Sequence, residues 1–141
     1  MIANHLAAKA AFFSIGTNDL IQYSVAVDRT NDRISKLYEP FHPGVLRMIQ
    51  MTIDAGHAHG IKVAVRGEVS NDPVAALVLL GMGIDELSMA PRYIPTIKSL
   101  IRRVKIEDAQ ELARAILNVS SAEEAKQYIE KAIERLNLHI T

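Results

Sequence analysis

Three short segments of the chain carry residue types that could bind a charged ligand. They are Gly16-Thr17-Asn18-Asp19, Arg66-Gly67-Glu68 and Ser88-Met89-Ala90. In the first segment the glycine allows close approach of the backbone, the threonine and asparagine offer hydrogen bonds, and Asp19 offers a carboxylate. Magnesium in proteins usually takes one or two carboxylates, with water and substrate phosphate filling its other positions. The first segment therefore predicts a site where a divalent cation could bind.

Structural roles are also open to these residues. Asn18 or Asp19 could cap a helix that follows, since both types accept hydrogen bonds from free backbone N–H groups. Arg29 could grip an anion through its fork of donors, or it could pair with a surface acid such as Asp28 or Asp32.

Arg66 directly follows the apolar run 63–65. A guanidinium buried there without an anion would be costly. It could hold a ligand anion, or it could form a structural ion pair with Glu68 or Asp72.

Other chemistries lack their residue patterns. His57 and His59 lie two residues apart and face different directions on a helix, so we expect solvated or helix-terminal residues and not a metal site. The chain contains no phosphate-binding glycine loop and no serine-hydrolase motif.

Apolar periodicity predicts the elements that position these residues. Strands are expected over 11–15, 61–65 and 85–89. Helices are expected over 2–10, 18–27, 43–60, 74–80, 97–104, 106–117 and 122–136, with an irregular excursion over 28–43 that contains a helical turn near 34–38. Gly81 is expected to end the fourth of these helices, residues 70–73 to begin it, and Ser120 or Ser121 to cap the last one.

This alternation indicates an α/β fold in which helices connect parallel strands. In such folds ligands meet the carboxyl ends of the strands, where loops converge and helix N-termini direct free N–H groups at the site. A complete βα barrel has eight strands and takes ~250 residues. The chain is therefore either a small three-layer sheet or the last part of a larger barrel.

Composition excludes several classes of protein. Of the 141 residues 49% are apolar and 23% charged, and 16 Lys and Arg balance 16 Asp and Glu. A disordered chain or a basic nucleic-acid binder is excluded on these grounds. The chain has no cysteine, residues 1–13 lack the basic region of a signal peptide, and the apolar stretch 74–82 is shorter than the ~20 residues of a membrane span. We expect a cytoplasmic protein without membrane insertion.

The residues around the first strand end carry a family resemblance. Phe12-Phe-Ser-Ile-Gly-Thr-Asn-Asp-Leu20 runs on into Ile21-Gln-Tyr-Ser-Val-Ala-Val-Asp-Arg29. The similarity continues at Leu37-Tyr-Glu-Pro40, His42-Pro43, Val45-Leu46, Gly67-Glu68, Asp72-Pro73, the run from Leu79 to Met89, and Ile94-Pro95. Together these segments resemble the phosphoenolpyruvate-utilising enzymes, and specifically enzyme I of the bacterial sugar phosphotransferase system.

The resemblance implies a fold and a function. Residues 1–141 would be the C-terminal part of a phosphoenolpyruvate-binding (β/α)8 TIM barrel, with its last three strands and flanking helices, and residues 105–141 would be C-terminal helices. The activity would be transfer of the phosphoryl group from phosphoenolpyruvate to a protein histidine, with Mg²⁺ as cofactor and release of pyruvate. A small phosphocarrier protein would be the next acceptor, through an N-terminal domain that this chain lacks.

Site residues follow from the same resemblance. Asn18 matches a residue that binds phosphoenolpyruvate near its phosphate, Asp19 matches a magnesium ligand that also lies in the substrate site, and Arg29 matches a phosphate-binding arginine. The proton donor of the family is a cysteine directly before Gly-Glu, and Arg66 occupies that position here. Because arginine stays protonated at any accessible pH, we expect Arg66 to hold an anion but to fail as a general acid.

Three strands would leave two open sheet edges, so we expect a homo-oligomer or a domain-swapped assembly.

The isolated chain is expected to be inactive. Two alternatives stay open: a relative of pyruvate phosphate dikinase or phosphoenolpyruvate synthase, and a non-catalytic part-barrel whose role is assembly.

Overall fold

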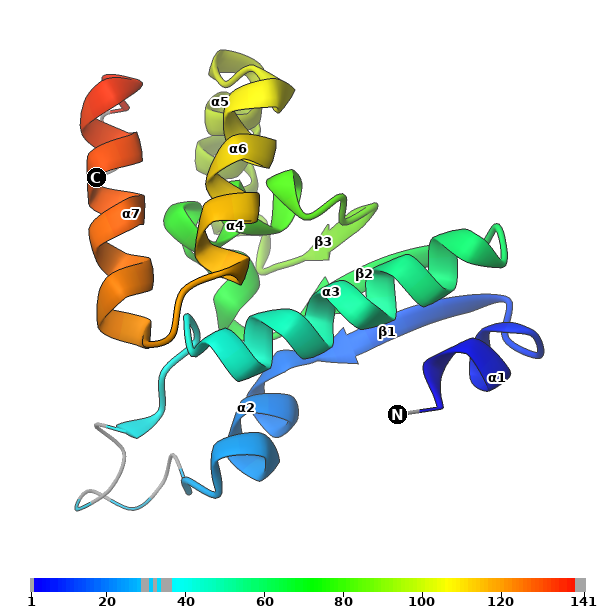
Figure 1. Ribbon diagram of the computed structural model, residues 1–141. Coiled ribbons are helices and arrows are strands. Elements are labelled where there is room, and N and C mark those ends of the chain that lie inside the picture. Colours follow the sequence, from blue (N-terminus) through cyan, green and yellow to red (C-terminus); the bar gives the residue numbers. More distant parts are fainter. Residues whose placement is uncertain (1, 29–30, 32, 34–36, 139–141) are drawn as a thin grey trace.

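The computed structural model describes residues 2–28, 31, 33 and 37–138 (Figure 1). Its elements are α1 (Ala3–Ala7), β1 (Phe12–Gly16), α2 (Thr17–Val25), α3 (Pro43–Ala58), β2 (Lys62–Arg66), η2 (Glu68–Asn71), α4 (Pro73–Gly81), β3 (Glu86–Ser88), η3 (Pro91–Tyr93), α5 (Ile94–Arg103), α6 (Ile106–Leu117) and α7 (Ala122–Arg135). The predicted strands and long helices are all present, with ends shifted by a few residues. The helical turn predicted near 34–38 falls mostly outside the described residues.

The three strands form one parallel sheet in the order β1-β2-β3. Gly16 pairs with Arg66, and Arg66 pairs with Ser88. The parallel arrangement predicted from the alternation of helices and strands is confirmed. All three carboxyl ends therefore lie at the same end of the sheet.

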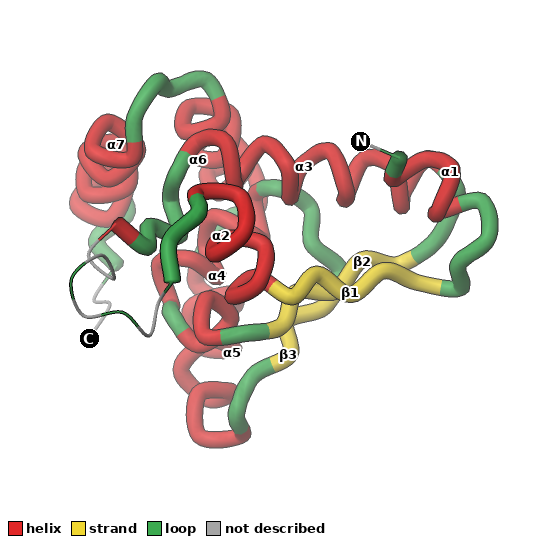
Figure 2. The backbone as a smooth tube through the Cα atoms, turned by 90° about the horizontal axis from the view of Figure 1, so that it is seen from below, coloured by secondary structure: helices red, strands yellow, loops and turns green. Residues whose placement is uncertain are grey.

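The two faces of the sheet differ in chemistry. One face contributes Phe13, Ile15, Val63, Val65 and Leu87 to the hydrophobic core, and both valines are 0% exposed. Helices α1 and α3 lie along one side of β1 and β2 (Figure 2). The alternate residues are largely exposed; Phe12 and Ala64 are apolar, and the polar ones are Ser14, Lys62, Arg66, Glu86 and Ser88. The sheet is therefore packed on one face and open to solvent on the other.

Gly81 ends α4, as the sequence predicts, and it also has a packing role. It is the last residue of the helix, and the chain turns at Gly83, where φ is +89°. A Cβ atom on Gly81 would lie 2.0 Å from the carbonyl oxygen of Ala109 in α6. The glycine therefore permits close packing of α4 against α6, a long-range requirement that helix-stop patterns do not reveal.

Two helix starts follow the sequence prediction. The Asp72 carboxylate accepts a hydrogen bond from Val74 N–H at 2.8 Å and caps α4. The Ser121 hydroxyl accepts one from Glu124 N–H at 3.1 Å, which selects the second of the two candidate serines as the cap of α7. Each cap satisfies a backbone donor that the first helical turn leaves free.

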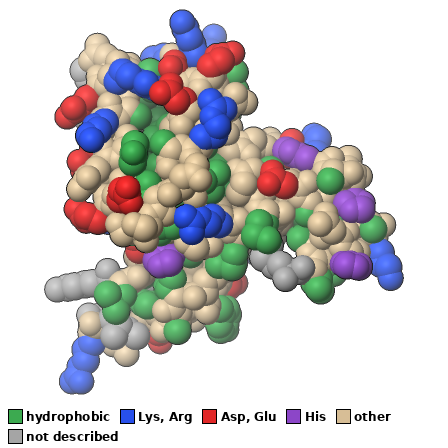
Figure 3. All heavy atoms as spheres, in the orientation of Figure 1, with side chains coloured by type: hydrophobic (Ala, Val, Ile, Leu, Met, Phe, Trp, Pro, Cys, Tyr) green, Lys and Arg blue, Asp and Glu red, His purple; other side chains and the backbone are tan. Residues whose placement is uncertain are grey.

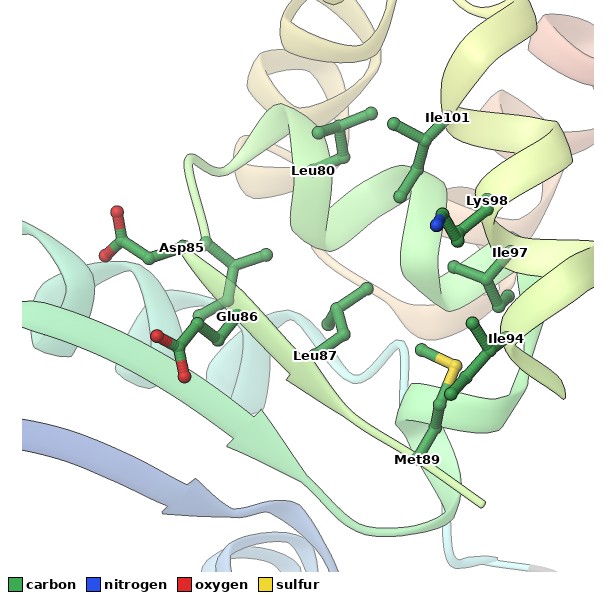
Figure 4. Close-up of a pocket in the computed structure, with 10 residues that line it drawn as sticks. Leu80, Asp85, Glu86, Leu87, Met89, Ile94, Ile97, Lys98 and Ile101 are labelled. Carbon is green, nitrogen blue, oxygen red and sulfur yellow. The ribbon is translucent and has the colours of Figure 1, made fainter. Parts of the chain in front are cut away.

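Hollows lie beside both outer strands. One, of about 440 Å³, lies between β3 and α5 and is lined mainly by apolar side chains such as Leu87, Ile97 and Ile101 (Figure 4). The other, of about 260 Å³, lies beside β1 and α1 and includes Leu6 and Phe13. Apolar surface next to unpaired strand edges marks both sides of the sheet as places where further structure can pack.

The surface formed by helices α5 to α7 carries charged side chains of both signs. Lys, Arg, Asp and Glu side chains are interspersed over the upper part of the molecule in Figure 3, where helices α5 to α7 lie. Among the described helices, none combines the length and the apolar character needed to cross a bilayer.

Asp85 links the amino ends of β2 and β3. Its carboxylate accepts hydrogen bonds from Val63 N–H at 2.8 Å and from His57 at 2.9 Å, and its own N–H donates to the Val63 carbonyl. The bond from Val63 N–H, followed by the His57 side chain, holds the pKa of Asp85 below its usual value although partial burial opposes this. His57 lies in the last turn of α3 and is 44% exposed, as expected of a solvated or terminal residue, but its ring also contacts the Asp85 carboxylate.

The depressed pKa of Asp85 predicts an acid-dependent loss of stability. A carboxylate that ionises more readily in the folded state stabilises it fully above the unfolded pKa of about 3.9, and this contribution is lost as pH falls through the lower folded pKa. We expect Asp85→Asn to lower the free energy of unfolding at pH 7, and the difference from wild type to shrink below about pH 4. Urea unfolding between neutral and acid pH measures this, and His57→Gln should alter the pH dependence less. A constant difference down to acid pH would contradict the assignment.

Candidate functional site

The polar segments predicted to carry chemistry meet at the carboxyl end of the sheet. The pairing of Gly16 with Arg66 and of Arg66 with Ser88 brings all three segments next to one another. Helix α2 begins directly after β1, so its free N–H groups lie at the same end. We call this region the rim, defined by residues 16–19, 66–68 and 88–90.

Thr17 ties the ends of β1 and β2 together. Its side chain is 0% exposed, and its hydroxyl donates a hydrogen bond to the Arg66 carbonyl at 3.0 Å. Gly67 lies against it with φ +123° and ψ −175°, a conformation in which side chains are strongly disfavoured. A Cβ atom on Gly67 would lie 2.5 Å from the Thr17 hydroxyl and 3.1 Å from Asn18 Oδ1. The segments that contain Thr17 and Gly67 therefore approach as closely as their backbones allow.

Asn18 is held by neighbours from two other segments. Its Oδ1 atom accepts hydrogen bonds from the Tyr38 hydroxyl at 3.2 Å and from Glu68 N–H at 3.4 Å. The capping alternative for Asn18 and Asp19 is not realised, because Gly16 is the N-cap of α2 and no side chain caps this helix. Both residues lie instead in the first turn of α2, where a carboxylate interacts favourably with the helix dipole.

The side chains of Asp19 and Arg66 both lie near the position that a Cβ atom on Gly16 would occupy. A Cβ atom on Gly16 would be 3.7 Å from Asp19 Oδ2 and 3.5 Å from Arg66 Nη2. Both side chains are exposed. Within the described part of the chain, Arg66 forms no ion pair, so the alternative pairing with Glu68 or Asp72 is not found. The rim thus presents a carboxylate and a guanidinium side by side to solvent.

Two further points concern the predicted ligands. Arg29, expected to bind phosphate or to pair with Asp28 or Asp32, lies outside the described residues. No group of three or more His, Asp or Glu side chains suited to a metal occurs among the residues described. Asp19, the predicted magnesium ligand, and Glu68 are the carboxylates of the described rim, and both are exposed.

Tyr38, which contacts the rim, and Thr17, which lies in it, have roles that the sequence did not reveal. Tyr38 lies in an irregular segment that contacts Asn18 across 20 positions of sequence, and no local periodicity reports such a contact. The one available signal was its place in the segment Leu37-Tyr-Glu-Pro40, which contributes to the family resemblance.

Comparison with known proteins assigns this arrangement to a family. Residues 1–106 match the family described as PEP-utilising enzyme, PEP-binding domain. The chain belongs to the phosphoenolpyruvate-utilising enzymes. The matched range includes all three strands and the entire rim, whereas helix α7 lies beyond it.

Curated relatives of this family are similar over nearly the whole chain. A phosphoenolpyruvate-protein phosphotransferase of Haemophilus influenzae is 51% identical over 129 residues, which are 92% of this chain and 22% of that protein. Proteins of the same name from Buchnera aphidicola and Listeria monocytogenes are each 45% identical, over 94% and 93% of this chain and 23% of their own lengths. The chain therefore spans between a fifth and a quarter of the length of these relatives.

The close approach at Gly67 predicts that an added methyl group there is costly. We expect Gly67→Ala to lower the free energy of unfolding by about 1–3 kcal/mol, through backbone strain and a clash with Thr17. Gly60→Ala is the matched control, since Gly60 has φ +69° but nothing within 4 Å of its Cβ position. It should cost about 1 kcal/mol. Urea denaturation compares the two, and equal losses would show that contact with Thr17 is unimportant.

Proposed function

We propose that this chain forms the last three strands and the C-terminal helices of a (β/α)8 barrel in a phosphoenolpyruvate-protein phosphotransferase. Its rim would hold part of the phosphoenolpyruvate site of that enzyme. The observation that carries the proposal is the meeting of Asn18, Asp19 and Arg66 at the carboxyl ends of parallel strands, where barrel enzymes place their active sites. The names of the relatives favour this function over that of a dikinase or synthase.

The shape of the sheet supports a barrel. Its polar, exposed face would line the barrel interior, and the apolar face already packs against helices. Closing a barrel requires neighbours for β1 and β3, and the apolar hollows beside both strands offer surface for further βα units. When those units are lacking, the same edges would favour self-association, so the expectation of a homo-oligomer belongs to this proposal.

Mg²⁺ fits the proposed rim through one ligand. Asp19 is exposed and forms no ion pair with any described residue, so its carboxylate oxygens are available to a cation. A magnesium ion needs few protein ligands when water and phosphate oxygens complete its octahedron. In the proposed enzyme the cation would neutralise charge on the phosphoryl group being transferred.

The other rim residues would bind and orient the substrate. The Asn18 amide would donate hydrogen bonds to the phosphate, and Arg29 would hold the same group through its guanidinium. Phosphoryl transfer depends on such fixed donors, because little covalent chemistry is required of the protein. The phosphoryl group would pass to a histidine elsewhere in the enzyme and then to a phosphocarrier protein, in the cytoplasm.

Arg66 sets this chain apart from the pattern of its family. A guanidinium can bind the carboxylate or phosphate of phosphoenolpyruvate but cannot release a proton to the enolate that remains after transfer. The proposed site is therefore competent to bind substrate and poor at forming pyruvate. This feature also favours the second candidate function, a part-barrel that serves assembly and not turnover.

A titration with phosphoenolpyruvate and Mg²⁺ tests the proposed site. We expect saturable heat in calorimetry with the wild-type chain, and loss of the Mg²⁺-dependent part in Asp19→Asn, which keeps shape but removes charge. Asp54→Asn is the matched control, because Asp54 lies near the far end of α3 and contacts Gln50. Absence of saturable heat with wild type would contradict the binding site and favour the assembly role.

A second experiment tests the role of position 66. In a full-length phosphotransferase that carries this segment, we expect Arg66→Cys to accelerate pyruvate formation by about 100-fold, the scale of general acid catalysis. Arg66→Ser removes the same cation without adding a thiol and should give no such gain. Equal pyruvate formation by the two variants would overturn the assignment of position 66 to the proton donor.

A further inference from the structure

The segment that precedes α3 connects the C-terminal helix to the rim. Tyr38 contacts Asn18, and the neighbouring Glu39 forms an ion pair with Lys126 of α7. Helix α7 lies outside the range that matches the phosphoenolpyruvate-binding domain. Its residue Lys126 nevertheless pairs with Glu39, which is adjacent in sequence to Tyr38, the residue that contacts the rim. We call residues 37–42 the rim strap.

We propose that Tyr38 is a positioning residue for the rim, and that the Lys126–Glu39 pair holds it in place from α7. Tyr38 would orient the Asn18 side chain so that its amide N–H groups face the bound ligand. The inference rests on the proposed function, which makes Asn18 a ligand of phosphoenolpyruvate.

The hydrogen bonds of Asn18 determine which of its two amide atoms, the oxygen or the nitrogen, is left to contact a ligand. The amide has one oxygen that accepts and one nitrogen that donates two hydrogen bonds. The oxygen already accepts from the Tyr38 hydroxyl and from Glu68 N–H. A ligand at the rim therefore meets the nitrogen, which suits an anion such as phosphate. Without Tyr38, a rotation that exchanges oxygen and nitrogen would cost less, and it would present an acceptor to the anion.

Glu39 is well placed to anchor Tyr38. One carboxylate oxygen pairs with Lys126, and the other accepts a hydrogen bond from Phe41 N–H at 3.0 Å. The Glu39 side chain is 20% exposed, so the pair is less screened by solvent than most surface ion pairs. The same contact with Glu39 raises the pKa of Lys126 above its usual value, although partial burial opposes this. The contact thus favours the charged form of Lys126.

Helix α7 is itself fixed to the body of the molecule. Arg47 of α3 donates hydrogen bonds to the carbonyl of Leu117, the last residue of α6, at 2.9 Å and to that of Val119, in the connection to α7, at 2.8 Å. Arg135 of α7 donates to both carboxylate oxygens of Glu111 in α6, at 3.1 and 3.2 Å. Lys126 thus projects from a helix with a defined position, as an anchor for the strap requires.

Side-chain NMR tests the positioning role without any ligand. We expect the Asn18 amide group to be nearly as ordered as the backbone in wild type, with an order parameter of about 0.85, and to fall toward about 0.6 in Tyr38→Phe. Lys126→Ala should produce a smaller drop, and Lys126→Arg should restore order. Glu39→Gln keeps an oxygen for Phe41 N–H but loses the charge, so it should behave like Lys126→Ala. Tyr128→Phe and Lys131→Ala, both on α7, are the matched controls and should leave Asn18 unchanged.

Titration with phosphoenolpyruvate and Mg²⁺ then tests the consequence for binding. Tyr38→Phe is expected to weaken affinity by about threefold to tenfold, the range for loss of one hydrogen bond, and Lys126→Ala by less. An unchanged Asn18 in Tyr38→Phe would overturn the positioning role, and an unchanged Asn18 in Lys126→Ala would overturn the anchor. If wild type fails to bind phosphoenolpyruvate, the proposed function fails, while the NMR comparison still decides whether Tyr38 orients Asn18.

Discussion

The parallel pairing of β1 with β2 is the constraint on which the site depends. It places Gly16 opposite Arg66, and the Thr17 hydroxyl bonded to the Arg66 carbonyl fixes the two strand ends at that register. A shift by one residue would turn Val63 and Val65 out of the core, so burial on one face enforces the arrangement on the other. The chemistry at the rim is thus maintained by hydrophobic packing on the opposite side of the sheet.

Much of this arrangement could be predicted from the sequence, because it follows from local pattern and chain direction. Alternating helices and strands predict parallel strands, and parallel strands place residues 16–19 beside residues 66–68. Contacts between distant segments could not be predicted in this way. His57 meets Asp85 across 28 positions and Tyr38 meets Asn18 across 20, and neither pair leaves a periodic signal in the chain. Gly81 shows the same limit, because its neighbour in α6 is fixed by tertiary packing.

The first turn of α2 shows why residue type alone misleads about role. Asn and Asp are the preferred caps of helices, yet at this site the chain enters the helix through Gly16, and Asn18 and Asp19 fall inside the first turn. The backbone of β1 runs directly into α2 without a loop in which either residue could serve as a cap. Neither side chain is used to cap α2, so the Asp19 carboxylate is exposed at the end of the sheet and the Asn18 oxygen bonds to other segments instead.

Arg66 contributes a positive charge to the rim, beside its proposed effect on proton transfer. Its guanidinium and the Asp19 carboxylate both lie within 4 Å of one point above Gly16. A positive charge at that position favours an anionic ligand. Under the proposed function the arginine would therefore supply part of the charge stabilisation that a metal ion otherwise provides, while it removes the group that completes the reaction. Binding and turnover would then be separated in this chain by the residue at position 66.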